Sequence, residues 1–274
     1  MKLPGHRRFG LHSAIRRTIG GDVQLRMQLL RTAIAVIAVF APAFGDPIKL
    51  VVPFGATSVP GNTDDNVDDG AVVDIHSQTV YGRGQFLNAG ITGPALISAL
   101  AYRAAPDTGP VSINFTAVAI YASTSPYAPN SSRFNALLTD TFATNLGPDN
   151  TLVFSASPLV RSSPGCAGPS ACPFDLVIAF DAPFLYDPTQ GFLLIDAFLT
   201  GISGAGELDA SDFSPPGGPI ATLVGSLDFP TGEFLDLGGI VTQFTVEAVP
   251  EPSSGLLLLG GLALVLLRKR IFRK

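Results

Sequence analysis

The last 26 residues, Val249–Lys274, restrict the chain more than any other stretch, because they read as a membrane segment of fixed orientation. A Pro-Glu-Pro element comes first, and its prolines favour an extended backbone over a helix. An uncharged run from Gly255 to Leu267 follows, and five of the final seven residues are Lys or Arg. Since basic residues stay on the cytoplasmic side of a membrane, this order predicts a C-terminal transmembrane anchor helix.

The apolar run is short for a membrane span. Its 13 residues would cover roughly 20 Å as a helix, whereas the hydrocarbon core of a bilayer is about 30 Å thick. We expect Ile271 and Phe272 to extend the apolar surface while Arg268 and Lys269 snorkel to the interface. The alternative is a terminal helix buried in the protein core, which rarely ends in so dense a basic cluster.

The tail resembles the PEP-CTERM sorting signal of Gram-negative bacteria, through Pro250-Glu251-Pro252, the run Gly255–Leu267 and the cluster Arg268–Arg270. The resemblance implies a substrate of exosortase, a membrane-embedded cysteine-peptidase-like enzyme. It also implies a connection with systems that export exopolysaccharide. It covers only the tail, so it indicates where the chain goes and leaves the activity of the remaining residues open.

The resemblance gives each part of the tail a role. The processing motif is Pro250, Glu251 and Pro252, and the basic stop-transfer cluster is Arg268, Lys269 and Arg270. The implied partners are an exosortase-type peptidase, the inner membrane as a transient host, and exopolysaccharide. The anchor residues are Gly255, Leu256, Leu257, Leu258, Leu259, Gly260, Gly261, Leu262, Ala263, Leu264, Val265, Leu266 and Leu267.

Residues 1–45 are expected to form a leader with a signal peptide. Arg31 ends a basic region, Thr32–Phe40 is apolar, and small residues allow cleavage after Ala43 or Gly45. This pattern predicts export by Sec, with an uncleaved signal anchor as the alternative; translation from Met27 would shorten the leader. Both ends then keep basic residues in the cytoplasm and place the body, residues 46–248, outside. We expect a precursor anchored in the inner membrane and a mature protein at the cell surface or beyond it.

The body is strongly acidic. It holds five basic and twenty acidic residues, a net charge of −15, although the whole chain carries only −5. A surface of this charge repels phosphate backbones, so we exclude nucleic acid as a partner.

The body reads as short strands separated by turns rich in Gly and Pro. Val111–Tyr121 alternates best, with Val111, Ile113, Phe115, Ala117, Ala119 and Tyr121 on one face. Ile91–Tyr102 is expected to be a strand on either side of a bend, with a helix from Pro94 as the alternative. Further strands are predicted at Ile48–Val52, Val72–Ile75, Thr79–Tyr81, Thr151–Ser155, Phe174–Phe180, Gly191–Thr200, Ile220–Leu227 and Ile240–Ala248.

One helix is predicted over Ser132–Leu146, since Ser132 can cap it and apolar residues recur at helical spacing. Gly82–Gly84 reads as a turn and Thr57–Gly70 as a polar loop. Tyr186–Asp196 resembles a recurrent hairpin in the bodies of PEP-CTERM proteins, with Phe192 where Asn is usual. The sequence therefore predicts an all-β fold, a jelly-roll-like β-sandwich with one short helix.

Side chains for catalysis are scarce in the body. His76 is its only histidine, and no Gly-x-Ser-x-Gly elbow accompanies it. We therefore expect a protein that is not an enzyme and uses no cofactor, with His76 as a strand residue near a surface loop. The alternative is a carbohydrate-binding or carbohydrate-cleaving domain acting on exopolysaccharide, because many acids make a pair of carboxylates easy to assemble.

Two local patterns remain. Cys166 and Cys172 bracket a Gly/Pro turn, which in an exported protein predicts a disulfide. Asp64, Asn66 and Asp68 have the one-three-five spacing of a calcium loop, but Asp69 and Ile75 stand where an EF-hand needs Gly and Glu. We expect a solvated acidic loop there and no metal site, and a second such loop at Glu207, Asp209 and Asp212.

Overall fold

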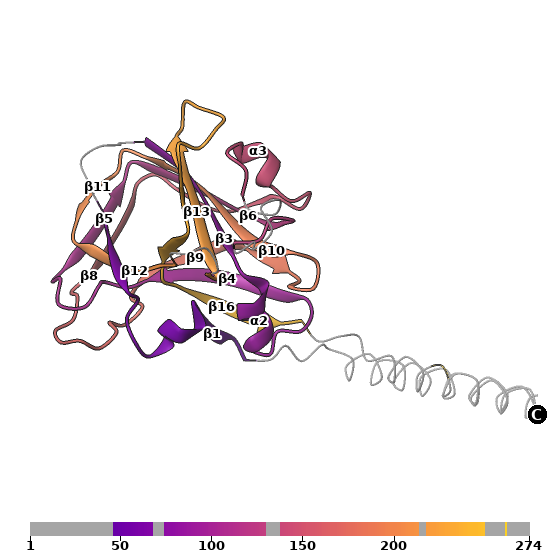
Figure 1. Cartoon of the computed structure of the whole chain (residues 1–274), viewed down its shortest axis with the longest axis horizontal. Coiled ribbons are helices and arrows are strands. Elements are labelled where there is room, and N and C mark those ends of the chain that lie inside the picture. Colours follow the sequence, from indigo (N-terminus) through magenta and orange to yellow (C-terminus); the bar gives the residue numbers. More distant parts are fainter. Residues whose placement is uncertain (1–45, 68–73, 130–137, 214–217, 250–260, 262–274) are drawn as a thin grey trace, which may run out of the picture. The chain divides into compact units, whose positions relative to one another are not determined.

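The computed structural model describes residues 46–67, 74–129, 138–213, 218–249 and 261. All of these except Gly261 belong to one compact unit, Phe44–Glu251, called the body below. The body is built almost entirely of antiparallel strands, which confirms the all-β prediction (Figure 1). The strands are β1 (Ile48–Val52), β2 (Thr63–Asn66), β3 (Asp74–Tyr81), β4 (Ala95–Tyr102), β5 (Val111–Phe115), β6 (Ala117–Ser125), β7 (Thr151–Ala156), β8 (Leu159–Ser163), β9 (Leu176–Tyr186), β10 (Phe192–Thr200), β11 (Ser203–Ala205), β12 (Glu207–Asp212), β13 (Ile220–Ser226), β14 (Phe234–Asp236), β15 (Gly238–Ile240) and β16 (Thr242–Ala248). The helices are η1 (Phe54–Thr57), α2 (Arg83–Asn88) and α3 (Phe142–Asn145).

Two large sheets form the frame of the body. One has four strands in the order β1-β16-β4-β9, and the other has six in the order β14-β13-β3-β10-β6-β7. Two sheets of three strands, β11-β5-β8 and β15-β12-β2, continue the structure at one end (Figure 1).

The antiparallel strand pairs are nested within one another along the sequence. The outermost pair joins the first and the last strand, and the innermost joins β6 and β7. Strand β1 pairs with β16, β3 with β10, β4 with β9, and β6 with β7, all antiparallel. Successive pairs alternate between the two large sheets. This is the strand order of a jelly roll, in which one long antiparallel ribbon is wound into two sheets that pack face to face.

The main core lies between the two large sheets. The four-stranded sheet contributes residues such as Leu50, Ile97 and Phe244, and the six-stranded sheet contributes Ile120 and Leu193. In β16, buried residues alternate with half-buried ones at the period of two that a strand with one core face requires. Thr242, Phe244 and Val246 therefore form the buried face of β16.

The best alternating segment is not a single strand. Thr116 is exposed and separates β5, in a small sheet, from β6, in the six-stranded sheet. Its N–H and hydroxyl both donate to Thr200 O, at 2.9 and 3.0 Å. Beyond this break the buried side chains are Val118, Ile120 and Ala122, so the predicted face of Ala117, Ala119 and Tyr121 was wrong.

The predicted helix and turn also need correction. Of Ser132–Leu146, residues 132–137 lie outside the described part, and only Phe142–Asn145 is helical in the remainder. The expected turn at Gly82–Gly84 instead opens helix α2, and Ala95–Tyr102 is a strand with no helix from Pro94.

Two predicted connections have a different structure. Within the predicted polar loop Thr57–Gly70, residues Thr63–Asn66 form β2, which pairs with β12. Strands β9 and β10 follow each other closely, but they belong to different large sheets, so Tyr186–Asp196 is a crossover and the expected hairpin was wrong.

Phe244→Ala should lower the free energy of unfolding by about 3–5 kcal/mol, because the lost ring leaves a cavity in the core. The Phe244 ring is fully buried and meets Tyr81 edge-on, with ring centroids 4.9 Å apart. Urea denaturation of the body would measure the loss. Val160→Ala is the control, since Val160 is 58 % exposed and should change stability by no more than about 0.5 kcal/mol. Equal losses would contradict this placement of the core.

Candidate functional site: the strand end that carries the tail

The body ends on a strand in the middle of a sheet. Strand β16 lies between β1 and β4, and its last residue, Ala248, is paired with Ala95. One more ladder bond follows, from Val249 N–H to Pro94 O at 3.0 Å. The next residue, Pro250, has no N–H and cannot continue the ladder. The hydrogen-bonded ladder of β16 and β4 therefore extends to Val249, the residue directly before Pro-Glu-Pro.

The beginning of the body lies beside this end. Strand β1 runs antiparallel to β16, and its first residue, Ile48, is paired with Val246. The described chain starts at Asp46 and the body's last described residue is Val249, so both ends of the body leave the same end of one sheet. The segments with the predicted leader and tail thus join neighbouring strands.

This end of the sheet is well packed. Ala95 pairs on its other side with Tyr186, whose buried hydroxyl donates to Gly191 O at 3.1 Å. The Tyr186 ring meets Phe86 of α2 edge-on at 4.9 Å. A shallow depression of about 480 Å³ lies alongside, lined by Pro94, Thr124, Pro148, Asp149, Leu185, Asp187 and Gln190.

Both acids of that depression already accept hydrogen bonds, Asp149 from strand β6 and Asp187 from its own loop. Asp149 accepts hydrogen bonds from the N–H and the hydroxyl of Thr124, at 2.8 and 2.7 Å. Asp187 accepts from the N–H and the hydroxyl of Thr189, at 2.9 and 2.7 Å. These contacts brace the loops around the strand end.

The residues predicted for the tail and the leader lie almost wholly outside the described part of the chain. This holds for Pro250, Glu251 and Pro252, for the cluster Arg268–Arg270, for every anchor residue except Gly261, and for Ala43 and Gly45. Among the residues that the structure describes, no helix is long and apolar enough to span a membrane.

His76 lies on the outer face of the six-stranded sheet and not in the core between the sheets. It is 8 % exposed, and its Nε2 donates to Asp196 Oδ1 at 2.7 Å. Its ring is stacked between Phe142 and Phe198, with centroids 3.7 and 4.2 Å away. A cavity of about 230 Å³ beside it is lined mainly by apolar groups. The two covered ring faces and the engaged Nε2 indicate that His76 anchors α3 to the sheet.

A second buried polar group ties the same helix down. Gln78 is fully buried, donates to Phe142 O at 3.1 Å, and accepts from Asn145 Nδ2 at 2.9 Å. Sequence reasoning missed Asp196, the partner of His76. The available signal was an acid in the middle of the apolar strand Phe192–Thr200, where an ionised group needs a partner.

Arg103 and Asp209 are the most deeply buried charged residues in the described part of the chain. Arg103 is 1 % exposed and binds Asp209 Oδ2 through Nε at 2.6 Å, while Nη2 donates to Ala56 O and Val59 O, both at 2.9 Å. Asp209 also accepts from Gly61 N–H at 2.8 Å. Burial raises the pKa of Asp209, and the charge of Arg103 opposes that rise. The pair fastens the segment after β1 to β12.

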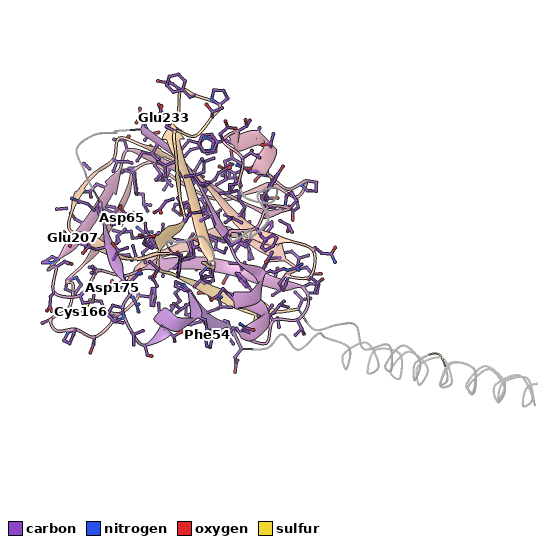
Figure 2. The ribbon with its side chains drawn as sticks, viewed as in Figure 1. Phe54, Asp65, Cys166, Asp175, Glu207 and Glu233 are labelled. Atoms are coloured by element: carbon purple, nitrogen blue, oxygen red, sulfur yellow. A yellow bond between two sulfur atoms is a disulfide. The ribbon has the colours of Figure 1, made fainter. Side chains whose placement is uncertain are left out.

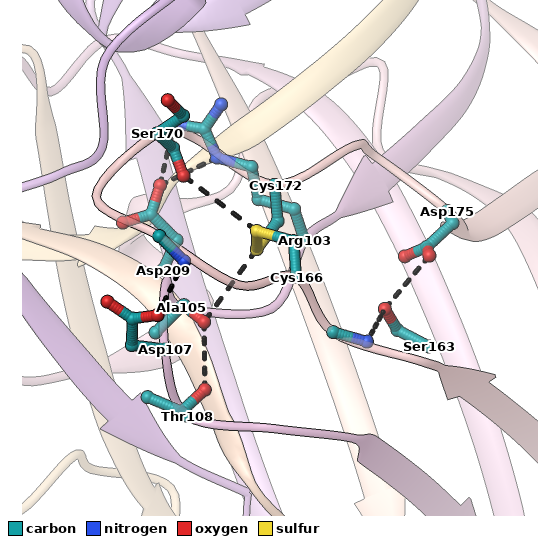
Figure 3. Close-up of a disulfide and its surroundings, with 12 residues drawn as sticks. Arg103, Ala105, Asp107, Thr108, Ser163, Cys166, Ser170, Cys172, Asp175 and Asp209 are labelled. Atoms are coloured by element: carbon teal, nitrogen blue, oxygen red, sulfur yellow. Dashed lines mark hydrogen bonds and ion pairs between the residues drawn. A yellow bond between two sulfur atoms is a disulfide. The ribbon is translucent and has the colours of Figure 1, made fainter.

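The two cysteines are joined as a disulfide, with Cα atoms 5.5 Å apart (Figure 3). Their loop is held against the turn after β4, because Asp107 Oδ1 accepts from Gly168 N–H at 2.5 Å and Asp107 N–H donates to Cys166 O at 3.2 Å. The Cys172 sulfur lies 3.8 Å from Ala105 O, and Figure 3 shows Arg103 and Asp209 close to this junction.

The predicted acidic loops meet each other as strands. Asp64 and Asn66 lie on β2, where Asp64 is paired with Asp209 and Asn66 with Glu207; Asp65 and Glu207 are labelled in Figure 2. Asp68 lies outside the described residues. In the described part of the chain, no group of three or more His, Cys, Asp or Glu is placed to hold a metal ion.

One pair of carboxylates does interact in the body. Burial raises the pKa of Asp236, and the negative charge of Asp212 raises it further. A carboxyl group with a raised pKa beside a second carboxyl group is a feature that acid catalysis of glycoside cleavage uses. This pair is the residue-level basis for the carbohydrate-cleaving alternative.

Asp209→Ala should destabilise the body by about 3–5 kcal/mol, because it leaves the buried Arg103 guanidinium without its counter-charge. Asp64→Ala is the matched control, an exposed acid directly opposite Asp209 across the strand pair, with an expected change of no more than about 0.5 kcal/mol. Denaturant unfolding of both variants would measure the difference. A loss for Asp209→Ala no larger than the control would contradict the structural role of the ion pair.

The stability of the body should fall at strongly alkaline pH. Burial raises the pKa of Tyr102 from 10.0 to about 12, and it also raises the pKa of Tyr81 and Tyr186. Since the unfolded chain releases these protons at lower pH than the folded body, stability is complete below about pH 10 and is lost as pH rises toward 12. Phenolate absorbance and the denaturation midpoint, followed together against pH, would test this. Ionisation of all five tyrosines near pH 10 in the folded body would contradict it.

A family model of the PEP-CTERM protein-sorting motif matches residues 248–271. The match begins at the last residue of β16 and covers Pro-Glu-Pro, the apolar run and the basic cluster. No curated protein matches the chain. A motif of this kind implies export, a membrane-held precursor and later release at the surface. The chain thus carries the PEP-CTERM sorting motif of an exported exosortase substrate, and this motif begins at the last residue of β16, an inner strand of the four-stranded sheet.

Proposed function

We propose that the protein is a non-catalytic component of the cell surface or extracellular matrix, exported by Sec and associated with exopolysaccharide. The observation that carries the proposal is the sorting motif at residues 248–271. In this proposal the signal peptide and the apolar tail hold the precursor at the inner membrane until exosortase cuts within or next to the motif. The body is the cargo that is released.

The polar groups of the body support a structural role for it. Two buried pairs hold parts of the body together: Arg103 with Asp209 fastens the segment after β1 to β12, and His76, bonded to Asp196, stacks on Phe142 of α3. The disulfide Cys166–Cys172 braces a surface loop, as suits a protein outside the reducing cytoplasm. A net charge of −15 over residues 46–248 keeps copies of the body apart and soluble.

A second candidate is a carbohydrate-binding or carbohydrate-cleaving body acting on exopolysaccharide. Its fold favours binding by analogy, because jelly rolls are common among lectin domains. The raised pKa of Asp236 beside Asp212 favours cleavage. The depression beside the strand end has no aromatic side chain among its described lining residues, so we place the structural role first.

A glycan array and a reducing-sugar assay on the purified body separate these functions. The structural proposal expects no release of reducing sugar and no glycan bound specifically. Binding without cleavage would favour the carbohydrate-binding candidate. Cleavage that Asp236→Asn lowers by about a hundredfold or more would refute the structural proposal.

Glu251→Ala should leave the full-length precursor in the membrane fraction while the body folds normally. Glu251 is the one acid between the end of β16 and the basic cluster, so a basic pocket in the peptidase can recognise it. Fractionation and tail-specific mass spectrometry, in a host that carries exosortase, would measure processing.

Glu247→Ala is the matched control for this experiment. Glu247 is also an acid near the chain's C-terminal end, but it belongs to β16 and lies outside Pro-Glu-Pro. The control should be processed and released like the parent. If Glu251→Ala were released equally well, recognition of the motif through its acid would be wrong.

A further inference from the structure

Exposed apolar side chains gather where the first strand of the body meets two short helices. Ile48 of β1 is 38 % exposed, Phe54 of η1 is 53 % exposed and Leu87 of α2 is 38 % exposed. The Phe54 N–H donates to Gln85 Oε1 at 2.6 Å, so η1 lies directly against α2. Figure 1 shows β1 and α2 side by side, and Figure 2 labels Phe54 at the same place. The surface formed by Ile48, Phe54 and Leu87 is called the apolar face below.

The packing of α2 holds this face in place. The Phe86 ring is fully buried and meets the rings of Tyr186 and Phe244, with centroids 4.9 and 5.8 Å away. Phe244 is paired with Leu50 of β1, and Leu50 belongs to the same core cluster as Phe86. Ile48 lies two residues before Leu50 and therefore faces the same side of β1. The exposed apolar side chains thus stand on elements that the core fixes.

The charge of this face differs from that of the rest of the body. Together β1, η1 and α2 contain two basic residues, Lys49 and Arg83, and no acid, whereas acids outnumber bases by 20 to 5 in residues 46–248. Both bases are exposed. Lys49 Nζ donates to Thr245 Oγ1 at 2.6 Å, and the Arg83 guanidinium lies over the Phe192 ring, 5.5 Å from its centroid. Apolar side chains flanked by cations are typical of a surface that contacts anionic phospholipid.

The chain connections bring this face near the membrane. Strand β1 begins at Ile48, beside the end of β16 that leads into the tail. Only five residues, 250–254, separate Val249 from the apolar run that begins at Gly255, and fully extended they reach no more than roughly 18 Å. A surface tethered at so short a distance meets the bilayer at a high effective concentration, so weak contacts are enough to hold it there.

We propose that, in the membrane-held precursor, the apolar face rests on the anionic phospholipid surface of the bilayer. Its three apolar side chains enter the headgroup region, and the two bases contact lipid phosphates. The proposal rests on the proposed function in taking the precursor to be held by its tail. This contact turns the acidic remainder of the body away from the bilayer.

The same face allows the body to leave after processing. Two acids at this end of the sheet, Asp46 and Glu247, lie next to the first pair of β1 and β16 and oppose the attraction of the bases. The contact therefore depends on the tether, and a body without its tail binds the bilayer only weakly.

A single tryptophan can report the contact, because the chain contains none. Full-length Phe54→Trp precursor is reconstituted into vesicles of phosphatidylcholine and phosphatidylglycerol, with part of the phosphatidylcholine brominated. We expect the brominated lipid to quench this reporter at least threefold more strongly than a Phe229→Trp reporter. Phe229 is the matched control because it is 55 % exposed. It lies on the loop between β13 and β14, which bonds to α3 through Pro230 O, on the opposite side of the body from β1 and α2 (Figure 1).

Arg83→Glu tests the part played by charge. In the Phe54→Trp chain it should lower the quenching at least twofold, and vesicles of phosphatidylcholine alone should lower it in the same way, because each cation near an anionic surface contributes to binding. Arg161→Glu is the control, since it makes the same change of charge on β8 and should leave the quenching unchanged. Quenching that neither Arg83→Glu nor the loss of phosphatidylglycerol lowers would overturn the contact with anionic lipid.

The remaining outcomes separate the inference from the proposed function. If the full-length chain does not float with the vesicles, the membrane-held precursor is refuted, and the inference with it. If the chain floats but both reporters are quenched equally, the inference is overturned and the membrane-held precursor stands. If the fluorescence of Phe54→Trp shifts with protein concentration in the absence of lipid, the apolar face belongs to a contact with a second copy of the chain, which also overturns the inference.

Discussion

The ladder between β1 and β16 is the contact on which the form of the body depends. Five residue pairs, from Ile48–Val246 to Val52–Thr242, join the first strand to the last. They close the ribbon, and they place β16 between two neighbours, where its side chains become part of the core. Because the strands are antiparallel, the same ladder brings the start and the finish of the body to one end of the sheet. A membrane-held precursor with this body needs no long linker at either junction.

Buried polar side chains connect strands and loops of the body that are far apart in the sequence. Arg103, directly after β4, binds both β12 and the segment after β1 through one guanidinium. The hydroxyl of Tyr81 bonds the hydroxyl of Thr242 across the core at 3.0 Å. Removing one member of either pair would leave its buried partner without a hydrogen bond. That loss costs more free energy than the bond itself contributes. The body therefore gains a fixed arrangement of loops from few polar contacts, while its surface stays acidic.

The sequence predicted strands in which apolar residues are concentrated. Ile48–Val52 and Gly191–Thr200 were expected as strands, and the structure forms strands at Ile48–Val52 and Phe192–Thr200. Strand β2 was missed because all four of its residues are exposed. Its pairing with β12 therefore requires no apolar residues that the sequence could show. The break at Thr116 was missed because alternation continues across it in the sequence while the buried face changes. The contact of His76 with Asp196 depends on the register of β3 against β10. This register cannot be predicted from the residues around either side chain.

Nested pairing also determines the order in which the strands can find their partners during folding. Strands β6 and β7 are close in the chain and can pair early, whereas Lys49 and Thr245 are 196 positions apart. A ribosome makes β1 first and β16 last, and contacts between distant segments form slowly. Strand β1 must therefore wait, without its partner, until the whole body has been synthesised. The strand that completes the sheet is the one that runs into the sorting motif, so completion of the fold coincides with arrival of the signal for release.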